Sequence, residues 1–172
     1  MRIVQKLTDL KFLNVNKVVD EDNNVGGYLF AERLGVDSVA FICYDENLDL
    51  FLVNKEYKPP IADFVVGAFG GSIDKAKTRE QIVVDEVKEE AGFVVSEDDV
   101  YYVGRSFVST QMNQYCYLFL VRVNKDNQDE REPENAIEAM AETQWLAEEE
   151  VIGLDDWKAI AIVSKAKKRK LI

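Results

Sequence analysis

Residues 70–93 read GGSIDKAKTREQIVVDEVKEEAGF, and this stretch decides the fold that we expect of the chain. A glycine pair leads into a polar turn, and an amphipathic segment then runs to Ala91, with Gly92 directly after it. Thr78 is of a residue type that caps helix N-termini, and glycine favours the left-handed conformation that closes a helix. The pattern therefore predicts a strand, a turn and a helix that begins after Thr78 and ends at Ala91.

Three glutamates share one face of this predicted helix. Glu86, Glu89 and Glu90 are three and four residues apart, and such spacings bring side chains together on a helix. Like charges placed in this way repel each other unless a cation lies between them. Hard divalent cations, Mg²⁺ above all, prefer such oxygen ligands and usually bring a phosphate substrate. The sequence thus predicts a metal-binding helix face.

The composition restricts the class of protein and of reaction. The 172 residues suffice for one domain with its own core, and the net charge of −11 disfavours binding to a nucleic-acid backbone. Histidine is absent, which excludes Ser-His-Asp, Cys-His and His-zinc chemistry. Cys43 and Cys116 lie in apolar strand-like runs, so we expect two buried free thiols and a cytoplasmic protein. The N-terminus lacks the apolar core of a signal peptide, and no apolar run approaches the length of a membrane span.

The chain alternates between strand-like and helix-like segments. Short alternating stretches predict a small antiparallel meander over residues 1–35. Strands followed by a helix, and then again strands followed by a helix, predict a mixed sheet with helices packed on it. Residues 125–144 are acidic and loop-like. The remaining predicted elements are strands at 38–44, 50–54, 64–69, 100–108 and 115–123, and a terminal helical region at 147–170.

The glycine and glutamate positions of this stretch resemble the Nudix box, G-x5-E-x7-R-E-U-x-E-E-x-G-U, in which U is aliphatic. Lys77 stands where the family has glutamate, and Asp85 stands where it has arginine. The matching residues are Gly71, Glu86, Val87, Glu89, Glu90 and Gly92, with the bulky apolar Phe93 in the last position.

The flanks resemble the ADP-ribose pyrophosphatase branch of that family. Residues 37–42 and 52–60 are similar to its approach strands, the second of which typically reads V-x-Q-[FY]-R-P-P, and residues 103–123 fit its later strands. The chain is therefore identified as a single Nudix domain, an α/β fold in the form of an α/β/α sandwich with a mixed sheet. Residues 1–35 would form the N-terminal β meander through which this branch dimerises, and residues 36–172 would form the catalytic fold.

The resemblance implies a Mg²⁺-dependent hydrolase, with Mn²⁺ as a substitute. The substrate would be a nucleoside diphosphate derivative, above all a nucleotide sugar such as ADP-ribose, and the products a nucleoside monophosphate and a sugar phosphate. Two alternatives stay open: a catalytically weak or inactive Nudix-fold sensor of nucleotide sugars, and a hydrolase of another nucleotide such as a dinucleotide or an RNA cap. The implied partners are the small substrate and a second copy of the chain, without long nucleic acid or membrane.

The resemblance also implies the metal ligands. Glu86 and Glu90 would be the principal Mg²⁺ ligands, and the Gly70 carbonyl would be a backbone ligand. Glu89 would be either a third ligand or a catalytic group that positions water.

Further residues would bind the substrate or activate water. Tyr57, Lys58 and Gln114 would contact the substrate. The catalytic base would come from the late acidic stretch that holds Glu132, Glu134 and Glu138, and we favour Glu134 or Glu138.

Three departures from the family pattern bear on activity. The family's arginine at position 85 pairs with the glutamates, which an aspartate cannot do. We hypothesise that Lys77 and Asp85 form a charge-swapped pair, or that Lys77 partly offsets the acidic cluster. The loop 106–114 lacks the S-P-G motif of the branch and has Gln114 in place of a glutamate, so we expect a reshaped substrate loop.

Overall fold

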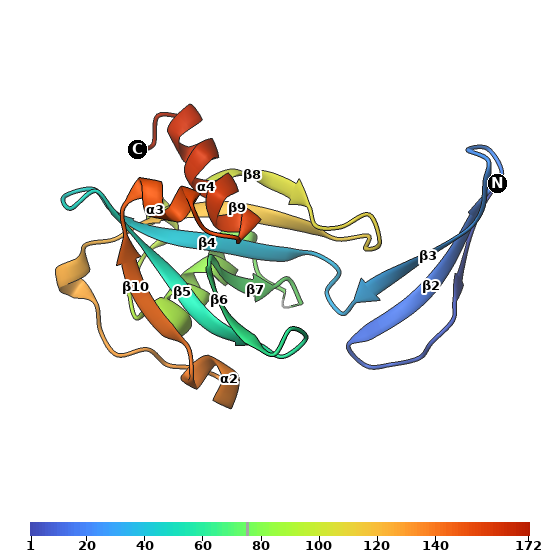
Figure 1. Cartoon of the computed structure of the whole chain (residues 1–172), viewed down its shortest axis with the longest axis horizontal. Coiled ribbons are helices and arrows are strands. Elements are labelled where there is room, and N and C mark those ends of the chain that lie inside the picture. Colours follow the sequence, from blue (N-terminus) through green and yellow to red (C-terminus); the bar gives the residue numbers. More distant parts are fainter. Residues whose placement is uncertain (75) are drawn as a thin grey trace.

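A mixed sheet of seven strands forms the middle layer of the computed structural model, which describes residues 1–74 and 76–172 (Figure 1). At its centre β4 (Ser38–Asp45) runs parallel to β9 (Tyr115–Arg122), and the path across the sheet is β10-β5-β4-β9-β8. Two short strands extend it, since β6 pairs with β5 and β7 with β4. The other strands are β5 (Leu50–Lys58), β6 (Asp63–Gly67), β7 (Phe69–Ser72), β8 (Val100–Phe107) and β10 (Glu142–Leu146).

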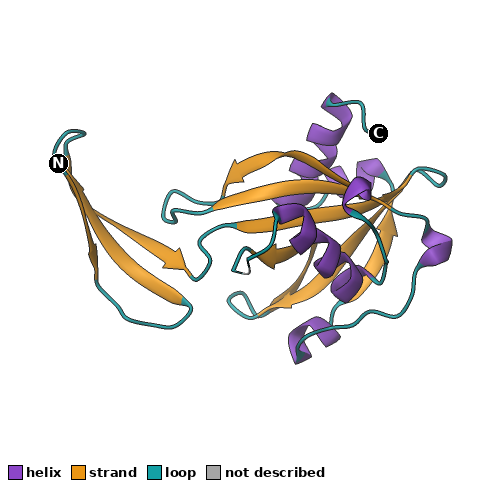
Figure 2. Cartoon of the chain, turned by 180° about the vertical axis from the view of Figure 1, so that it is seen from behind, coloured by secondary structure: helices purple, strands orange, loops and turns teal. Residues whose placement is uncertain are grey.

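Helices cover both faces of this sheet (Figures 1 and 2). Successive strand residues point to opposite faces, so Phe41 and Ile42 of β4 enter two different cores. The Phe41 core contains α1 (Arg79–Glu86) and the π-helical turn η1 (Val87–Ala91), and the Ile42 core contains α3 (Glu148–Ile152) and α4 (Trp157–Lys168). The predicted α/β/α sandwich is therefore confirmed. The minor elements are η2 (Glu97–Asp99), η3 (Lys125–Asn127) and α2 (Ala136–Ala139).

One sequence expectation about the interior also holds. Cys43 and Cys116 are buried free thiols. Within the described ranges, every helix is too short or too polar to cross a membrane.

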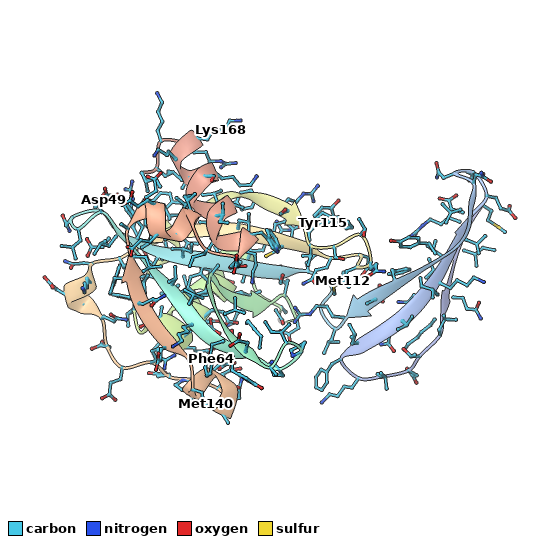
Figure 3. All side chains as sticks on the ribbon, viewed as in Figure 1. Asp49, Phe64, Met112, Tyr115, Met140 and Lys168 are labelled. Carbon is cyan, nitrogen blue, oxygen red and sulfur yellow. The ribbon has the colours of Figure 1, made fainter. Side chains whose placement is uncertain are left out.

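The N-terminal meander is a separate antiparallel sheet of three strands, β1 (Arg2–Lys6), β2 (Leu13–Asp20) and β3 (Val25–Arg33). It stands away from the seven-stranded body as an arm (Figure 1). The β8–β9 loop, whose Met112 is labelled in Figure 3, lies at the end of the body that faces the arm. There the Ala31 amide donates to the Gln111 carbonyl at 2.7 Å and the Tyr28 hydroxyl to the Thr110 carbonyl at 2.9 Å. The predicted meander is confirmed.

The helix predicted to follow Thr78 is formed by α1 and η1 together. Its two ends lie where we predicted them, but its last turn is not α-helical. Thr78 caps α1 in a reciprocal capping box with Gln81, and Gly92 closes η1 with φ +76°. From Val87 onward the turn is π-helical, so that the Gly92 amide donates to the Val87 carbonyl five residues back. Such wide turns recur at functional sites.

The acidic stretch after β9 is largely loop, as its composition predicts, and it is hydrogen-bonded to the end of the preceding helix. The Asp129 amide donates to the Gly92 carbonyl at 2.7 Å, and the Glu132 amide donates to the Glu89 carbonyl at 3.0 Å. The stretch therefore runs along the end of η1 and satisfies carbonyls that a helix C-terminus leaves without partners.

Two predicted elements are each divided in the structure. The expected strand 64–69 breaks at Ala68, because the Ala68 amide donates to Asp156 Oδ2 at 2.8 Å instead of to a neighbouring strand. The expected helix 147–170 breaks between Ile152 and Trp157, where Asp156 adopts the extended N-cap conformation of α4. Asp156 takes part in both breaks, since it accepts the Ala68 amide and caps the start of α4.

Gly92→Ala is expected to lower the free energy of unfolding by at least about 2 kcal/mol. The glycine has φ +76°, and an added Cβ would lie 2.3 Å from the Asp129 carbonyl oxygen, a backbone atom. Gly26→Ala is the matched control, because an added Cβ there meets nothing within 4 Å. Urea unfolding of both variants measures the difference. Equal effects of the two substitutions would show that the Gly92 conformation and its close contact carry no strain for alanine.

Candidate functional site

A cavity of about 390 Å³ lies where Gly70 and Gly71 of β7, the α1–η1 helix and the N-terminus of α4 meet. Its floor includes Val39, Ser38 and Cys116 from the two central strands. Its walls carry many charges of both signs. The lining includes the carboxylates of Glu56, Asp74, Glu86, Glu90, Glu134 and Glu138 and the cations of Arg33, Lys58 and Lys158.

Two helix glutamates press against the glycine strand. The Gly70 amide lies 3.4 Å from Glu90 Oε2 and donates to it. A Cβ on Gly71 would lie 2.3 Å from Glu86 Oε1, so a residue with a side chain at position 71 would displace that carboxylate. The glycines therefore permit the approach of both carboxylates to one backbone segment.

This crowding changes the acidity of Glu90. The pKa of Glu90 is raised to about 8, mainly by burial and next by the nearby charge of Glu86, with smaller contributions from Glu56 and Glu138. The hydrogen bond from the Gly70 amide lowers it and only partly offsets the rise. A carboxyl group in this position needs either a proton or a cation at neutral pH.

The donor set suits a divalent cation that keeps part of its water shell. Glu86, Glu90 and the backbone of Gly70 all line the cavity and offer hard oxygen ligands. Among the described residues, no three acidic or thiol side chains are already close enough to enclose an ion by themselves. Mg²⁺ commonly binds through one or two carboxylates, with waters and substrate oxygens completing the shell. The residues present fit such an ion.

Three predicted site residues lie outside the cavity lining within the described chain: Glu89, Tyr57 and Gln114. The π-helical turn η1 has more residues per turn than an α-helix. Glu90, four residues after Glu86, therefore lies on the same helix face as Glu86, whereas Glu89, three residues after it, is rotated away from that face. Tyr57 packs edge-on against Phe64 at 5.5 Å between ring centroids.

Gln114 is buried behind the cavity lining and contacts it through one lining residue. Its Nε2 donates to the hydroxyl of Ser38 at 3.0 Å, and Ser38 itself lines the cavity.

The other predicted substrate and base residues do line the cavity, namely Lys58, Glu134 and Glu138. Glu138 accepts hydrogen bonds from the amide of Glu134 at 2.8 Å and from the side chain of Asn135. Glu132 instead pairs with Lys88 at 3.0 Å. Of the glutamates in the acidic stretch, Glu134 and Glu138 are thus the two that the fold brings to the cavity.

The two positions that depart from the family pattern meet each other. Lys77 Nζ lies 2.5 Å from Asp85 Oδ2, and both side chains are partly exposed, at 45% and 34%. The hypothesis of a charge-swapped pair is therefore confirmed as a contact.

Arg33 and Lys158 line the cavity but were not predicted from the sequence. Arg33 ends β3 and its Nη2 donates to the Ser72 hydroxyl at 2.5 Å, and Lys158 lies in the first turn of α4. The Asp155-Asp156 pair does signal a helix start before Trp157. Nothing local shows that this start, or the end of β3, lies beside the glycine strand.

The comparisons with known proteins agree with this architecture. A family model described as the NUDIX domain matches residues 35–165. The solved structure titled "Crystal structure of ADP compounds hydrolase" superposes with a TM-score of 0.70 and 14% sequence identity, over 97% of this chain and 91% of that one. No curated protein matches the chain. Since the family model covers more than half of the sequence, the chain belongs to the NUDIX family, and its architecture is that of a Nudix pyrophosphohydrolase.

Proposed function

We propose that the protein hydrolyses the diphosphate linkage of a nucleoside diphosphate derivative, above all a nucleotide sugar such as ADP-ribose, in a Mg²⁺-dependent way. The proposal rests on the cavity, whose lining brings six carboxylates and three cationic side chains together with Gly70 and Gly71 of β7. The fold of a protein titled ADP compounds hydrolase supports the same substrate class. The products would be a nucleoside monophosphate and a sugar phosphate.

The charges of the cavity explain why a metal is needed. A diphosphate is repelled by a lining that holds more carboxylates than cations. A divalent cation, when bound, neutralises the diphosphate and activates a water for attack on phosphorus. Glu86, Glu90 and the Gly70 carbonyl would hold it, because both carboxylates lie against the strand that contains Gly70.

The cationic residues of the cavity lining would hold the substrate. Arg33 and Lys58 present cations to the same space and suit the phosphate oxygens. Glu134 and Glu138 both line the cavity, and either would serve as the general base. The hydrogen bonds that Glu138 accepts from the Glu134 amide and from Asn135 hold this part of the loop in place. Glu89 would act through the main chain, since its carbonyl anchors the acidic stretch at Glu132.

We infer in addition that the arm joins two copies of the chain. Large apolar side chains are exposed along it, and patches of this kind mark interaction surfaces. The side chains between 47% and 63% exposed include Ile3, Val4, Leu10, Phe12, Leu13 and Leu29.

Glu90→Gln tests the proposed function. Against a panel of ADP-ribose, other nucleotide sugars, a dinucleotide and capped RNA, the native chain should hydrolyse a nucleotide sugar best, with Mg²⁺ or Mn²⁺ and not with EDTA. The variant should lose about 100-fold or more in kcat, since even indirect supports of a metal are worth 10- to 100-fold. Glu130→Gln, at an exposed position, is the control. Binding of nucleotide sugars by the native chain without any turnover would instead favour the alternative of an inactive sensor of nucleotide sugars.

The same variant gives a readout of metal binding that does not depend on turnover. Without metal, the native chain should lose stability as pH rises from about 5 to 9, because folded Glu90 keeps a proton up to its pKa of about 8 while the unfolded chain releases it near 4.5. The loss is at most about 5 kcal/mol. Mg²⁺ should restore stability at pH 8, and Glu90→Gln should abolish both effects in thermal unfolding. A flat pH profile of the native chain would contradict the assignment.

Lys77→Glu and Asp85→Arg test whether the reversed pair keeps the box functional. Each single change removes the ion pair and places two like charges next to each other. A loss of about 1 kcal/mol of interaction energy corresponds to a fall in kcat/KM of about 5- to 10-fold. The double variant should return to within about 2-fold of the native value, because the pair is restored with opposite polarity. Lys168→Glu, on an exposed lysine, controls for net charge. A double variant whose loss equals the product of the single losses shows that the two residues act independently.

The arm is tested by the mass in solution. Sedimentation equilibrium should give twice the 19.6 kDa of one chain. Phe12→Asp with Leu29→Asp should yield a folded monomer, because two charges in an apolar contact are not compensated. Leu48→Asp, at a similarly exposed leucine in the β4–β5 turn, should leave the dimer intact. A monomeric native chain would refute the inference.

A further inference from the structure

Two lysines from distant parts of the chain face the same space. Lys58 ends β5, and Lys158 lies in the first turn of α4. Both line the main cavity, and both also line a small recess of about 30 Å³ beside it. Two lysines thus line both the main cavity, which also holds Glu86 and Glu90, and the recess beside it.

A carboxylate accompanies each of these ammonium groups. Lys58 Nζ lies 2.5 Å from Glu56 Oε2, and Lys158 Nζ lies 3.7 Å from Asp156 Oδ1. The lysine side chains remain 41% and 30% exposed, so an anion that enters the cavity can reach them. The carboxylates set where the cations stand before a substrate arrives.

The position of Lys158 is fixed by the fold rather than by a flexible surface. The buried Asp156 caps α4, and its Oδ2 also accepts from the Ala68 amide at 2.8 Å. Gly67 makes this contact feasible, since a Cβ there would lie 2.4 Å from the same oxygen. This hydrogen bond links the start of α4 to Ala68, the residue that precedes β7.

The recess shows a second polar feature next to the lysines. Asn54 is 4% exposed and lines the recess, and its Oδ1 has no hydrogen-bond partner among the described residues. A polar space of this size takes one water. Such a water would donate to Asn54 Oδ1 and accept from an ammonium group, which would tie Lys58 and Lys158 to one wall.

We propose that Lys58 and Lys158 together form a two-point clamp on one phosphate of the substrate. A lysine offers a single point charge, whereas an arginine presents a planar fork with two parallel donors. Two lysines that approach from a strand and from a helix supply the two donors separately, one to each of two oxygens. The clamp rests on the proposed function for the identity of the phosphate ligand.

The test is a comparison of Lys158→Ala, Lys58→Arg and the double variant, with the substrate that the native chain hydrolyses best. Lys158→Ala should raise KM about 10-fold and leave kcat within about 2-fold, as expected for one hydrogen bond to a charged group. In the Lys58→Arg background the same change should raise KM less than about 2-fold, because the guanidinium fork already supplies both donors. Lys168→Ala is the control, since Lys168 extends from the outer end of the same helix (Figure 3).

Two outcomes would overturn the clamp: an unchanged KM in Lys158→Ala, or an equal loss in both backgrounds. Failure of the proposed function looks different, because the native chain would then turn over no substrate of the panel. In that case calorimetric binding of ADP with Mg²⁺ to the same variants replaces KM. Loss of ADP affinity in Lys158→Ala that Lys58→Arg rescues would still support the clamp, and equal affinities would refute it.

Discussion

The contact of two glutamates with the adjacent glycines of β7 governs the rest of this structure. Glu86 comes so close to Gly71 that a Cβ would lie 2.3 Å from its carboxylate, and Glu90 accepts from the Gly70 amide. Negative charge is therefore concentrated where water is scarce, and burial together with Glu86 raises the pKa of Glu90 to about 8. A fold that holds this arrangement must provide a cation for it, or else keep a proton on it.

Two features of the fold enforce the contact. The register of β7 on β4 places Gly70 opposite Ala40 and Gly71 opposite Val39, which fixes the strand. The burial of Val83 and Val87 in the core fixes the rotation of the helix about its own axis. With the apolar face held against the sheet in this rotation, Glu86 lies beside Gly71 and Glu90 beside Gly70. The core thus sets the geometry of the acidic wall.

Local patterns predicted one half of the site, and long-range contacts made the other half. The Thr78 cap, the closing Gly92 and the alignment of Glu86 with Glu90 depend on residues a few positions apart, so the sequence shows them. Lys158 enters the cavity only because Asp156 bonds to Ala68, a contact between residues 88 positions apart. No pattern of spacing contains that information. The misplacement of Glu89 has a smaller cause, since a wide last turn rotates residues that an ideal helix would align.

The reversed pair of Lys77 and Asp85 changes more than its own polarity. The Coulomb attraction within a pair is the same whichever residue carries the positive charge. Its surroundings are not symmetric, because Asp85 stands on the helix beside Glu86 and one turn before Glu89, while Lys77 stands on the loop. The helix therefore carries an additional negative charge, which strengthens its attraction for a cation and its repulsion of a free diphosphate. Such a helix would favour a bound cation over a free diphosphate, and the basic side chains in the same cavity lining, Arg33, Lys58 and Lys158, would offset part of its negative charge.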